Sequence, residues 1–363
     1  MTTLTILLPL LLASTFLATP ALAADLPQIP QFIDEMVAKH QFQRDELVEV
    51  FQRAQHRPEI IAAITLPATT KPWPEYRASF VNDKRISGGV EFWQNHATTL
   101  QRAEQEYGVP QEIIVAIIGV ETLYGRHAGR FSTLDALTTL AFDFPRRAPF
   151  FRSELEHYLL LAREQSWALF KVTSSYAGAM GIPQFMPSSY RKHAVDFNGD
   201  GKIDLLGDPV DAIGSVANYL KQYGWLRGEP VAMLTQPGGL DTTDISSNLS
   251  SNLSSNLSGN FAASSVGTTQ TLAAWAQSGV HPATGSLTSG ISIPSSALPK
   301  NMLNEKSARL LAFTLTEGNE SWLAFKNFQV ITLYNNSNFY AMTVHQLAEE
   351  IRAAMEKNER VIH

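Results

Sequence analysis

The 363-residue sequence contains no cysteine. This absence excludes a disulfide-linked scaffold, a cysteine-ligated zinc site, a thiol nucleophile and a cysteine-linked lipid anchor. A chain of this length buries enough apolar surface to fold without such cross-links, and at about 150 residues per domain it corresponds to roughly two domains.

The sequence also lacks an excess of positive charge. It has 28 Lys and Arg against 34 Asp and Glu, for a formal net charge of −6. Proteins that bind nucleic acids carry a clustered basic excess. We therefore expect no nucleic-acid partner.

Charged residues are absent from the first 23 positions. An apolar run from Thr5 to Leu17 precedes Ala21-Leu22-Ala23, which fits an A-x-A cleavage site, although the usual Lys or Arg before the run is missing. We expect residues 1–23 to be a secretory signal peptide and the mature protein to be soluble. The alternative is a short membrane anchor that is not cleaved. No later segment has the ~18 uninterrupted apolar residues that a membrane span requires.

Apolar residues recur at helical spacing over most of the chain, which predicts a mainly α protein. We expect two short helices within 30–54, followed by helices at about 89–107, 110–124, 149–164, 209–223 and 343–357. Residues 56–87 are rich in proline and predict an extended arm. The β-rich runs 312–315 and 328–333 predict strands of a small mixed α/β subdomain.

Residues 241–300 break the helical pattern because they are rich in serine and almost uncharged. The tetrapeptide Ser-Ser-Asn-Leu occurs three times in tandem between Ser246 and Leu257. A polar repeat this short does not bury enough surface to order itself. We expect 241–268 to be a flexible insertion.

Glu121 follows eight residues that are all apolar or glycine, from Ile113 to Val120. Such a helix is buried on nearly all sides, and burial should raise the pKa of a carboxyl at its end above about 4.3. A raised pKa suits a general acid working near neutral pH. The alternative is a buried Glu121 paired with Arg126 or Arg130.

A polar, glycine-rich stretch from Ser174 to Tyr190 is atypical of a hydrophobic core. Glycine lets the backbone approach a ligand closely, and Ser, Gln and Tyr supply the hydrogen bonds that sugars require. The stretch therefore predicts a sugar-binding surface. The alternative is an ordinary loop followed by a helix that begins at Pro187.

Oxygen-bearing side chains alternate through Asp196, Asn198, Asp200 and Asp204, and Gly201 stands at the sixth position. This spacing fits the start of an EF-hand loop, in which Lys202 would contribute its backbone carbonyl. The twelfth position is Gly207 instead of an acid, so Asp208 or Asp211 would have to complete the site. The alternative is an Asx-rich turn without metal.

The segments Gly119-Val120-Glu121-Thr122-Leu123-Tyr124-Gly125-Arg126 and Gly178–Tyr190 together resemble the lytic murein transglycosylases with a goose-lysozyme-like core. More narrowly, the chain resembles the lytic transglycosylase B family over about 30–240 and 270–355. The resemblance implies a lysozyme-like helical catalytic domain with an embedded small mixed α/β subdomain and an EF-hand-like loop, which is one residue longer here than in the family.

The resemblance also implies roles for particular residues. Glu121 matches the family's single catalytic acid/base, and nine further positions match substrate-binding residues: Tyr76, Arg146, Arg147, Ser175, Gln184, Tyr219, Tyr334, Asn335 and Tyr340. Without the resemblance to the family, these tyrosines would be interpreted as packing residues and the arginines as surface ion-pair partners. The structural metal ligands would be Asp196, Asn198, Asp200, Lys202, Asp208 and Asp211, with Ca²⁺ as the ion and no cofactor for catalysis.

The implied reaction cleaves the β-1,4 bond between N-acetylmuramic acid and N-acetylglucosamine in peptidoglycan and closes a 1,6-anhydro ring. One alternative is a hydrolytic muramidase that uses a second carboxylate, for which Asp143 is the candidate unless it pairs with a neighbouring arginine. Another is a non-catalytic peptidoglycan-binding protein. The implied location is the periplasm, where the partners are glycan strands and any cell-wall enzyme complex is unidentified.

These expectations divide the chain into consecutive parts. They are a signal peptide (1–23), an N-terminal helical arm (24–87), a lysozyme-like core (88–240) containing the EF-hand-like loop (196–211), the insertion (241–268), and a subdomain with a C-terminal helix that completes the cleft (269–363).

Overall fold

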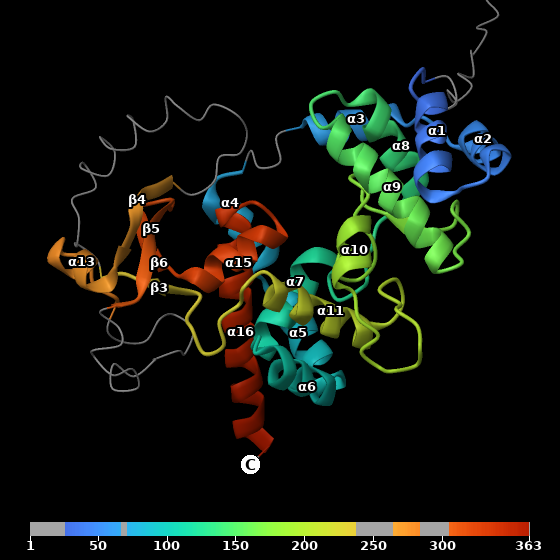
Figure 1. The fold of residues 1–363 in the computed structure, drawn as a ribbon. Coiled ribbons are helices and arrows are strands. Elements are labelled where there is room, and N and C mark those ends of the chain that lie inside the picture. The colour runs from blue at the N-terminus through green and yellow to red at the C-terminus, as the bar shows by residue number, and fades with distance from the viewer. Residues whose placement is uncertain (1–25, 67–70, 237–263, 284–304, 363) are drawn as a thin grey trace, which may run out of the picture.

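The computed structural model describes residues 26–66, 71–236, 264–283 and 305–362 (Figure 1). The expected signal peptide and most of the expected insertion lie outside these residues. Within them the backbone is mainly helical with small sheets, as predicted. No helix of this described part is long and apolar enough to cross a membrane.

Five helices form one lobe of the molecule, at the upper right of Figure 1. They are α1 (Ile29–His40), α2 (Arg44–Arg53), α3 (Pro58–Thr65), α8 (Thr133–Asp143) and α9 (Ala148–Glu164). Aromatic rings fill the space between them, since Phe32 meets Phe51 and Phe142 edge-on at centroid distances of 5.9 and 5.6 Å. The short helix α10 (Pro187–His193) packs on α9 and connects this lobe to the rest.

Helix α7 (Gln111–Thr122) is the centre of the second group of helices. It contacts α5 (Asp83–Asn95), α6 (Ala97–Tyr107), α11 (Pro209–Gln222) and the long C-terminal helix α16 (Asn338–Ile362). All residues from Ile113 to Val120 are buried. A helix apolar on every side is stable only when neighbours cover it all round, and these four helices do so.

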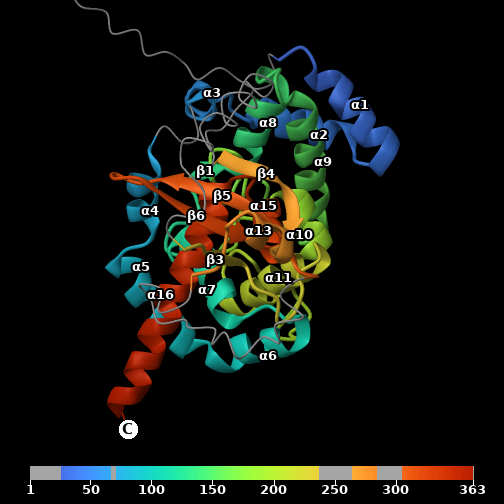
Figure 2. The same ribbon diagram turned by 90° about the vertical axis from the view of Figure 1, so that its left-hand side faces the viewer.

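A four-stranded antiparallel sheet lies on the other side of α16, at the left of Figure 1 and in front of the helices in Figure 2. Its strand order is β3 (Ala232–Leu234), β6 (Asn319–Ala324), β5 (Ser307–Thr314) and β4 (Ser264–Thr271). Helix α13 (Leu272–Gln277) covers it with a separate small core around Trp275, and α15 (Lys326–Tyr334) leads back to α16. This is the predicted mixed subdomain.

The predicted extended arm at 56–87 is wrong, because the described residues of this segment form α3, α4 (Trp73–Phe80) and the start of α5. Pro58 and Pro74 stand in the first turns of α3 and α4. Proline is tolerated there since the first turn has no intrahelical acceptor for its missing N–H. The prolines therefore begin helices here instead of excluding them.

Three other segments differ from the prediction. The helix expected at 89–107 is two helices that meet at His96, whose φ of −124° departs from helical geometry. The run 328–333, predicted as a strand, lies in helix α15, where Phe328, Val330 and Ile331 are buried. Residues 264–268, expected in the flexible insertion, belong to β4, which pairs with β5.

Candidate active site

Glu121 lies in the last turn of α7, which ends abruptly. The next three residues, Leu123, Tyr124 and Gly125, all have left-handed backbones, with φ of 51°, 62° and 83°. Left-handed backbone is uncommon outside glycine and is often concentrated at functional sites. The chain therefore turns away directly after Glu121, and the side chain stays partly exposed at the end of a buried helix.

Thr122 joins this helix end to the glycine-rich stretch. Its hydroxyl donates a hydrogen bond to the carbonyl oxygen of Ile182 at 2.8 Å and accepts one from the Gly125 amide at 2.9 Å. The sequence-based analysis missed Thr122, because a threonine at the end of an apolar helix has the same pattern as a core residue. The bond places Glu121 beside the turn Gly181–Gln184.

The carboxyl of Glu121 has an unusually high pKa. Burial raises its pKa from 4.5 to about 7, and a hydrogen bond from the Tyr340 hydroxyl to Oε1, at 2.6 Å, opposes that rise. Among the described residues no ion pair involves Glu121, since Arg126 pairs with Glu91 and Arg130 lies over the Phe131 ring. This geometry favours the general acid over the buried ion pair.

Three of the predicted tyrosines surround this carboxyl. The charge of Glu121 contributes to raising the pKa of Tyr76 to about 12, after the larger effect of burial, and it acts in the same direction on Tyr334 and Tyr340. The rings of Tyr334 and Tyr340 are stacked with centroids 6.4 Å apart. The structure thus brings tyrosines from α4, α15 and α16 to the end of α7.

Hydrogen bonds fix two tyrosines to backbone carbonyls. The Tyr334 hydroxyl donates to the Pro183 oxygen at 2.6 Å, and the Tyr219 hydroxyl donates to the Leu333 oxygen at 2.8 Å. The Tyr219 and Tyr334 rings meet at a centroid distance of 4.9 Å. Both residues therefore hold α15 against α11 and the glycine-rich stretch, and Tyr219 has the packing role as well as any role toward substrate.

The glycine-rich stretch forms a tight set of turns that carry Ser175 and Gln184. Gln184 has a left-handed φ of 53°, and its side-chain amide donates to the carbonyl oxygens of Ala128 and Gly181. The Ser175 hydroxyl accepts from the Ala179 amide at 3.2 Å. Gly178 also has a positive φ and packs on Leu137, where a Cβ would lie 2.4 Å from the leucine side chain. The glycines are thus required by close packing.

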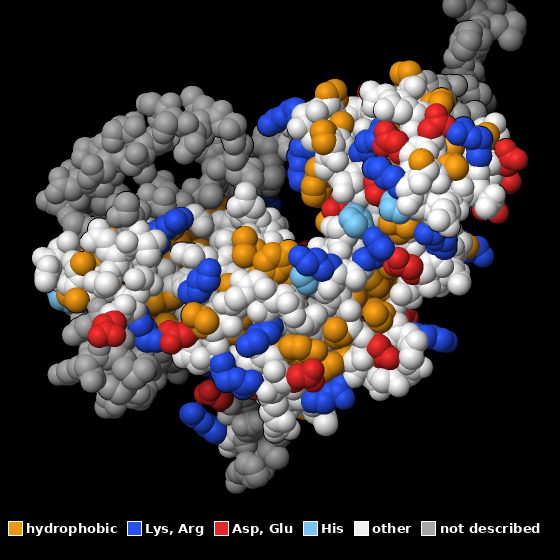
Figure 3. Space-filling view, in the orientation of Figure 1, with side chains coloured by type: hydrophobic (Ala, Val, Ile, Leu, Met, Phe, Trp, Pro, Cys, Tyr) orange, Lys and Arg blue, Asp and Glu red, His pale blue; other side chains and the backbone are white. Residues whose placement is uncertain are grey.

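Arg146, Arg147 and Asn335 are exposed and have no described contact with Glu121. Arg146 and Arg147 lie between α8 and α9, where the Arg147 guanidinium stacks 4.4 Å from the Phe150 ring centre. Asn335 follows α15. Figure 3 shows the surface indented between the lobe that carries the arginines and the rest of the molecule.

Asp143, the candidate second carboxylate, bonds to the ring of His56 at 2.8 Å. The alternative ion pair with Arg146 or Arg147 is absent from the ion pairs of the described residues, in which Asp143 pairs with His56. Asp143 thus has a structural partner outside the surroundings of Glu121.

The loop 196–211 is closed mainly by hydrogen bonds to its own backbone. The Asp196 carboxylate accepts amide bonds from Gly199, Asp200 and Gly201. The buried Asp211 carboxylate accepts three more, from Phe197, Asn198 and Asp204.

Asp208 differs from Asp211 in facing another proposed ligand. Its Oδ2 accepts from the Asn198 side-chain amide at 2.6 Å, while its Oδ1 caps α11 at the Val210 amide. The described residues hold no group of three or more Asp, Glu or His side chains close enough to bind a metal ion together. Asp208 thus lies beside the Asn198 side chain, whereas the Asp211 carboxylate accepts from backbone amides.

Comparison with known proteins agrees with this geometry. The family model of the transglycosylase SLT domain matches residues 25–349. The membrane-bound lytic murein transglycosylase B of Escherichia coli K12 is 39% identical over 343 residues, covering 91% of this chain and 84% of that protein.

Solved structures show the same fold. Soluble lytic transglycosylase SltB1 of Pseudomonas aeruginosa has a TM-score of 0.76 at 43% identity, covering 90% of this chain and 99% of that one. Slt35 of Escherichia coli in complex with calcium has a TM-score of 0.75 at 39% identity, covering 91% and 94%. SltB3 of Pseudomonas aeruginosa in complex with NAG-NAM-pentapeptide has a TM-score of 0.73 at 30% identity, covering 89% and 78%.

The match over most of the chain, the lysozyme-like helical fold shared with these structures and the raised pKa of Glu121 at the end of α7 lead to one conclusion: the chain belongs to the SLT transglycosylase family and is a lytic transglycosylase of murein.

Proposed function

We propose that this enzyme cleaves the β-1,4 bond between N-acetylmuramic acid and N-acetylglucosamine and releases a 1,6-anhydromuramoyl product. The observation that carries the proposal is the protonation state of Glu121, whose pKa of about 7 leaves it partly protonated at neutral pH. A carboxyl poised in this way can act first as an acid and then as a base.

The proposed reaction uses Glu121 twice. Protonated Glu121 donates its proton to the glycosidic oxygen, the bond to the muramoyl C1 breaks, and the substrate's own N-acetyl group stabilises the positive centre. Ionised Glu121 then takes the proton of the C6 hydroxyl, whose oxygen bonds to C1. Ordinary glycosidases use two carboxyl groups for such chemistry. Tyr340, which donates to Glu121 Oε1, would stabilise the ionised form between the two steps.

We propose that the nine substrate-binding positions act as the family resemblance implies. Tyr76, Tyr334 and Tyr340 are supported by their electrostatic coupling to Glu121, and Ser175 and Gln184 by their place on the stretch tied to Thr122. Arg146 and Arg147 are exposed cations on the facing lobe, where they could reach carboxylates of the peptide part of peptidoglycan. The ligand of SltB3 carries such a peptide.

We also propose a structural Ca²⁺ in the loop 196–211. Slt35, which shares the fold of this chain, has been solved in complex with calcium. Asp196, Asn198, Asp200 and Asp208 with the Lys202 carbonyl would hold it. Asp208 already lies beside Asn198, whose side chain would turn its oxygen toward the ion in place of the amide nitrogen that donates to Asp208. Oxygen donors of this kind are those that Ca²⁺ prefers. The ion would brace the loop before α11 and take no part in bond cleavage.

The proposed location is the periplasm, where the substrate is found. The apolar, uncharged first 23 residues support export.

Substitution of Glu121 tests the proposal most simply. Glu121→Gln keeps the shape and the Tyr340 contact but removes the transferable proton, so peptidoglycan solubilisation should fall by at least about 10²–10⁴-fold. Asp143→Asn is the matched carboxyl control and should keep activity within a few-fold. Lytic activity that survives Glu121→Gln and disappears in Asp143→Asn would contradict the proposal.

A further inference from the structure

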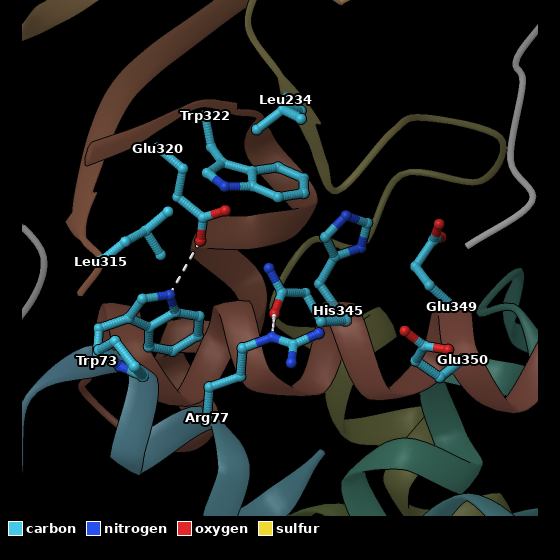
Figure 4. Close-up of a pocket in the computed structure, with 11 residues that line it drawn as sticks. Trp73, Arg77, Leu234, Leu315, Glu320, Trp322, His345, Glu349 and Glu350 are labelled. Carbon is cyan, nitrogen blue, oxygen red and sulfur yellow. Dashed lines mark hydrogen bonds between the residues drawn. The ribbon is translucent and has the colours of Figure 1, made fainter. Parts of the chain in front are cut away.

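A cavity of about 340 Å³ lies between α4, the sheet and α16, and the catalytic site does not use it (Figure 4). Its lining includes neither Glu121 nor Tyr340. Glu349 on its wall follows Tyr340 by nine residues along α16, about two and a half turns at 3.6 residues per turn, which places the two side chains on opposite faces of the helix. The cavity is therefore separate from the catalytic carboxyl.

Two tryptophans line the cavity, but neither exposes the face of its ring to a ligand. Trp73 and Trp322 are only 1% and 6% exposed. The indole N–H of Trp73 donates to Glu320 at 2.9 Å, whereas the buried indole N–H of Trp322 has no partner among the described residues. A bound sugar ring normally stacks on an exposed aromatic face. This lining consequently disfavours a sugar and favours a compact polar group that can accept from Trp322.

Charges of both signs line the same cavity. The Arg77 Nε donates to the Gln346 side chain at 2.6 Å, and its guanidinium has no ion pair among the described residues. Figure 4 shows the guanidinium directed along α16, on the side where Glu349 and Glu350 also lie. A guanidinium edge binds a carboxylate through two parallel hydrogen bonds.

The acidic end of the cavity is also available to a ligand. Glu350 has no ion pair in the described part of the chain, and Glu349 has only a long contact of 3.7 Å to Arg352. Burial raises the pKa of Glu349 to about 7, so this group is only partly ionised at neutral pH, and a bound ammonium group would favour its ionised form. Burial lowers the pKa of His345 to about 4, so this ring is uncharged at neutral pH and adds no positive charge to the cavity. An ammonium group is the complementary ligand there.

We propose that this cavity binds the zwitterionic end of a peptide, with its carboxylate on Arg77 and an ammonium group at Glu349 and Glu350. Its volume is at the lower end of the range for small-molecule sites, ~300–1,000 Å³, and suits one or two amino-acid residues. We take the peptide stem of peptidoglycan as the source, and in this the inference rests on the proposed function. A free peptide presents the same chemistry.

Calorimetric titration of the full-length Glu121→Gln protein tests the proposal. The probe is a synthetic pentapeptide with a free α-carboxylate and one side-chain ammonium. Two blocked forms, the C-terminal amide and the side-chain acetyl derivative, should each bind at least about tenfold more weakly. Equal binding of all three, or no binding of the free form, would overturn the proposal.

Variants locate the binding. Arg77→Gln should weaken binding of the free pentapeptide about tenfold or more and leave the affinity for the C-terminal amide unchanged. Glu350→Gln should likewise weaken binding of the free pentapeptide and leave the affinity for the side-chain acetyl derivative unchanged. Arg360→Gln, on the exposed end of the same helix, is the matched control for charge removal. Because Arg77 supports α16, thermal unfolding must show that each variant is folded.

Two further measurements test where the peptide binds and whether the peptidoglycan stem is its source. Peptide binding should persist in Arg146→Gln/Arg147→Gln, and its loss there would assign the peptide to the cleft. The same pentapeptide carried on a NAG-NAM disaccharide should compete for the cavity, and failure to compete would overturn the stem as the source. Product analysis of the wild-type enzyme tests the proposed function independently of peptide binding.

Discussion

At the scale of single residues, the chemistry depends on how the fold treats one carboxyl. Glu121 is desolvated by the helices around α7, and only Tyr340 donates to it among the described side chains. Desolvation disfavours the charged form and the hydrogen bond favours it. Because the two effects oppose each other, the pKa is raised only to about 7 and stays useful near neutral pH.

The raised pKa has a stability consequence for Glu121→Gln. The folded protein binds a proton at Glu121 more tightly than the unfolded chain, so wild-type stability falls as the pH rises from about 4.5 through about 7. Glutamine does not titrate. In urea unfolding the variant should match the wild type at about pH 4.5 and below and exceed it above pH 7, by about 3–3.5 kcal/mol for a pKa difference of about 2.5 at about 1.4 kcal/mol per pKa unit. A stability difference that does not change with pH would contradict the raised pKa.

Removal of the Tyr340 hydroxyl should move the activity profile. Tyr340→Phe deletes the hydrogen bond that lowers the pKa of Glu121, so this pKa should rise and the alkaline limb of kcat/KM should shift to higher pH. Tyr158→Phe removes another buried hydroxyl, bonded to the Leu169 carbonyl, and serves as the control with an unshifted profile. An alkaline limb that stays in place or moves to lower pH in Tyr340→Phe would disprove the assigned role.

Residue-level expectations were correct where local sequence determines the environment. Eight apolar or glycine residues before Glu121 imply a buried helix, and the raised pKa follows from that burial. The partners of Glu121 and Asp143 were not predictable in this way. Tyr340 lies 219 residues from Glu121, and His56 lies 87 residues from Asp143, so only the tertiary fold brings them together.

At the scale of elements, the end of α7 is fixed by close packing around Tyr124. Its hydroxyl donates to the Arg85 carbonyl at 2.6 Å, and its ring covers three glycines of α5 and α7. A Cβ at Gly119 would lie 2.5 Å from the Tyr124 hydroxyl. Glycine at this position therefore allows α5 and the turn after Glu121 to approach α7.

Gly119→Ala should thus be destabilising despite alanine's better helix propensity. We expect a loss of about 1–3 kcal/mol, typical of overpacking, together with reduced activity because the Glu121 turn shifts. Chemical denaturation and peptidoglycan solubilisation measure the two effects. Tyr124→Leu in the Gly119→Ala background should recover part of the stability, and strictly additive losses would show that the two side chains do not clash.

The loop 196–211 offers a test of calcium with two neighbouring acids. Millimolar Ca²⁺ should raise the unfolding temperature of the wild type by a few degrees, on the order of 2–4 °C, and a chelator should reverse it. Asp208→Asn should abolish this gain while still capping α11, because asparagine is a good N-cap. Mg²⁺ at equal concentration is the ion control.

Asp211→Asn should behave differently from Asp208→Asn. Its carboxylate accepts three backbone amides, so the variant should be destabilised by about 1–3 kcal/mol with or without Ca²⁺. A calcium-dependent gain that depends on Asp211 and not on Asp208 would reverse our assignment of the closing ligand.

Helices were predicted correctly where apolar residues recurred at helical spacing over a long segment. Predictions were wrong where tertiary packing overrode the local preference of the residues. The helices at 149–164 and 209–223 agree with α9 and α11 to within one residue. The run Phe328–Leu333 has strand-like composition, yet it forms α15 because its buried side chains recur at helical spacing against α11 and α16. The prediction of an extended arm at 56–87 was wrong because its prolines stand in the first turns of helices.

At the scale of the whole molecule, the site is assembled from segments far apart in the sequence. The central helix carries Glu121, the glycine-rich stretch is tied to it through Thr122, and α16 returns Tyr340 from near the end of the chain. The last strand of the sheet subdomain, β6, leads directly into α15, which is followed by α16. The family resemblance anticipated this return, whereas periodicity alone gave no indication of it.

The central claim is that Glu121 acts alone and that the muramoyl C6 hydroxyl, instead of water, closes the reaction. Mass spectrometry of the muropeptides released from purified peptidoglycan in heavy-oxygen water tests it directly. We predict products that end in 1,6-anhydro-N-acetylmuramic acid, lighter than the hydrolytic products by one water molecule and free of heavy oxygen. Reducing ends that carry heavy oxygen would show that water is the acceptor and would contradict the account.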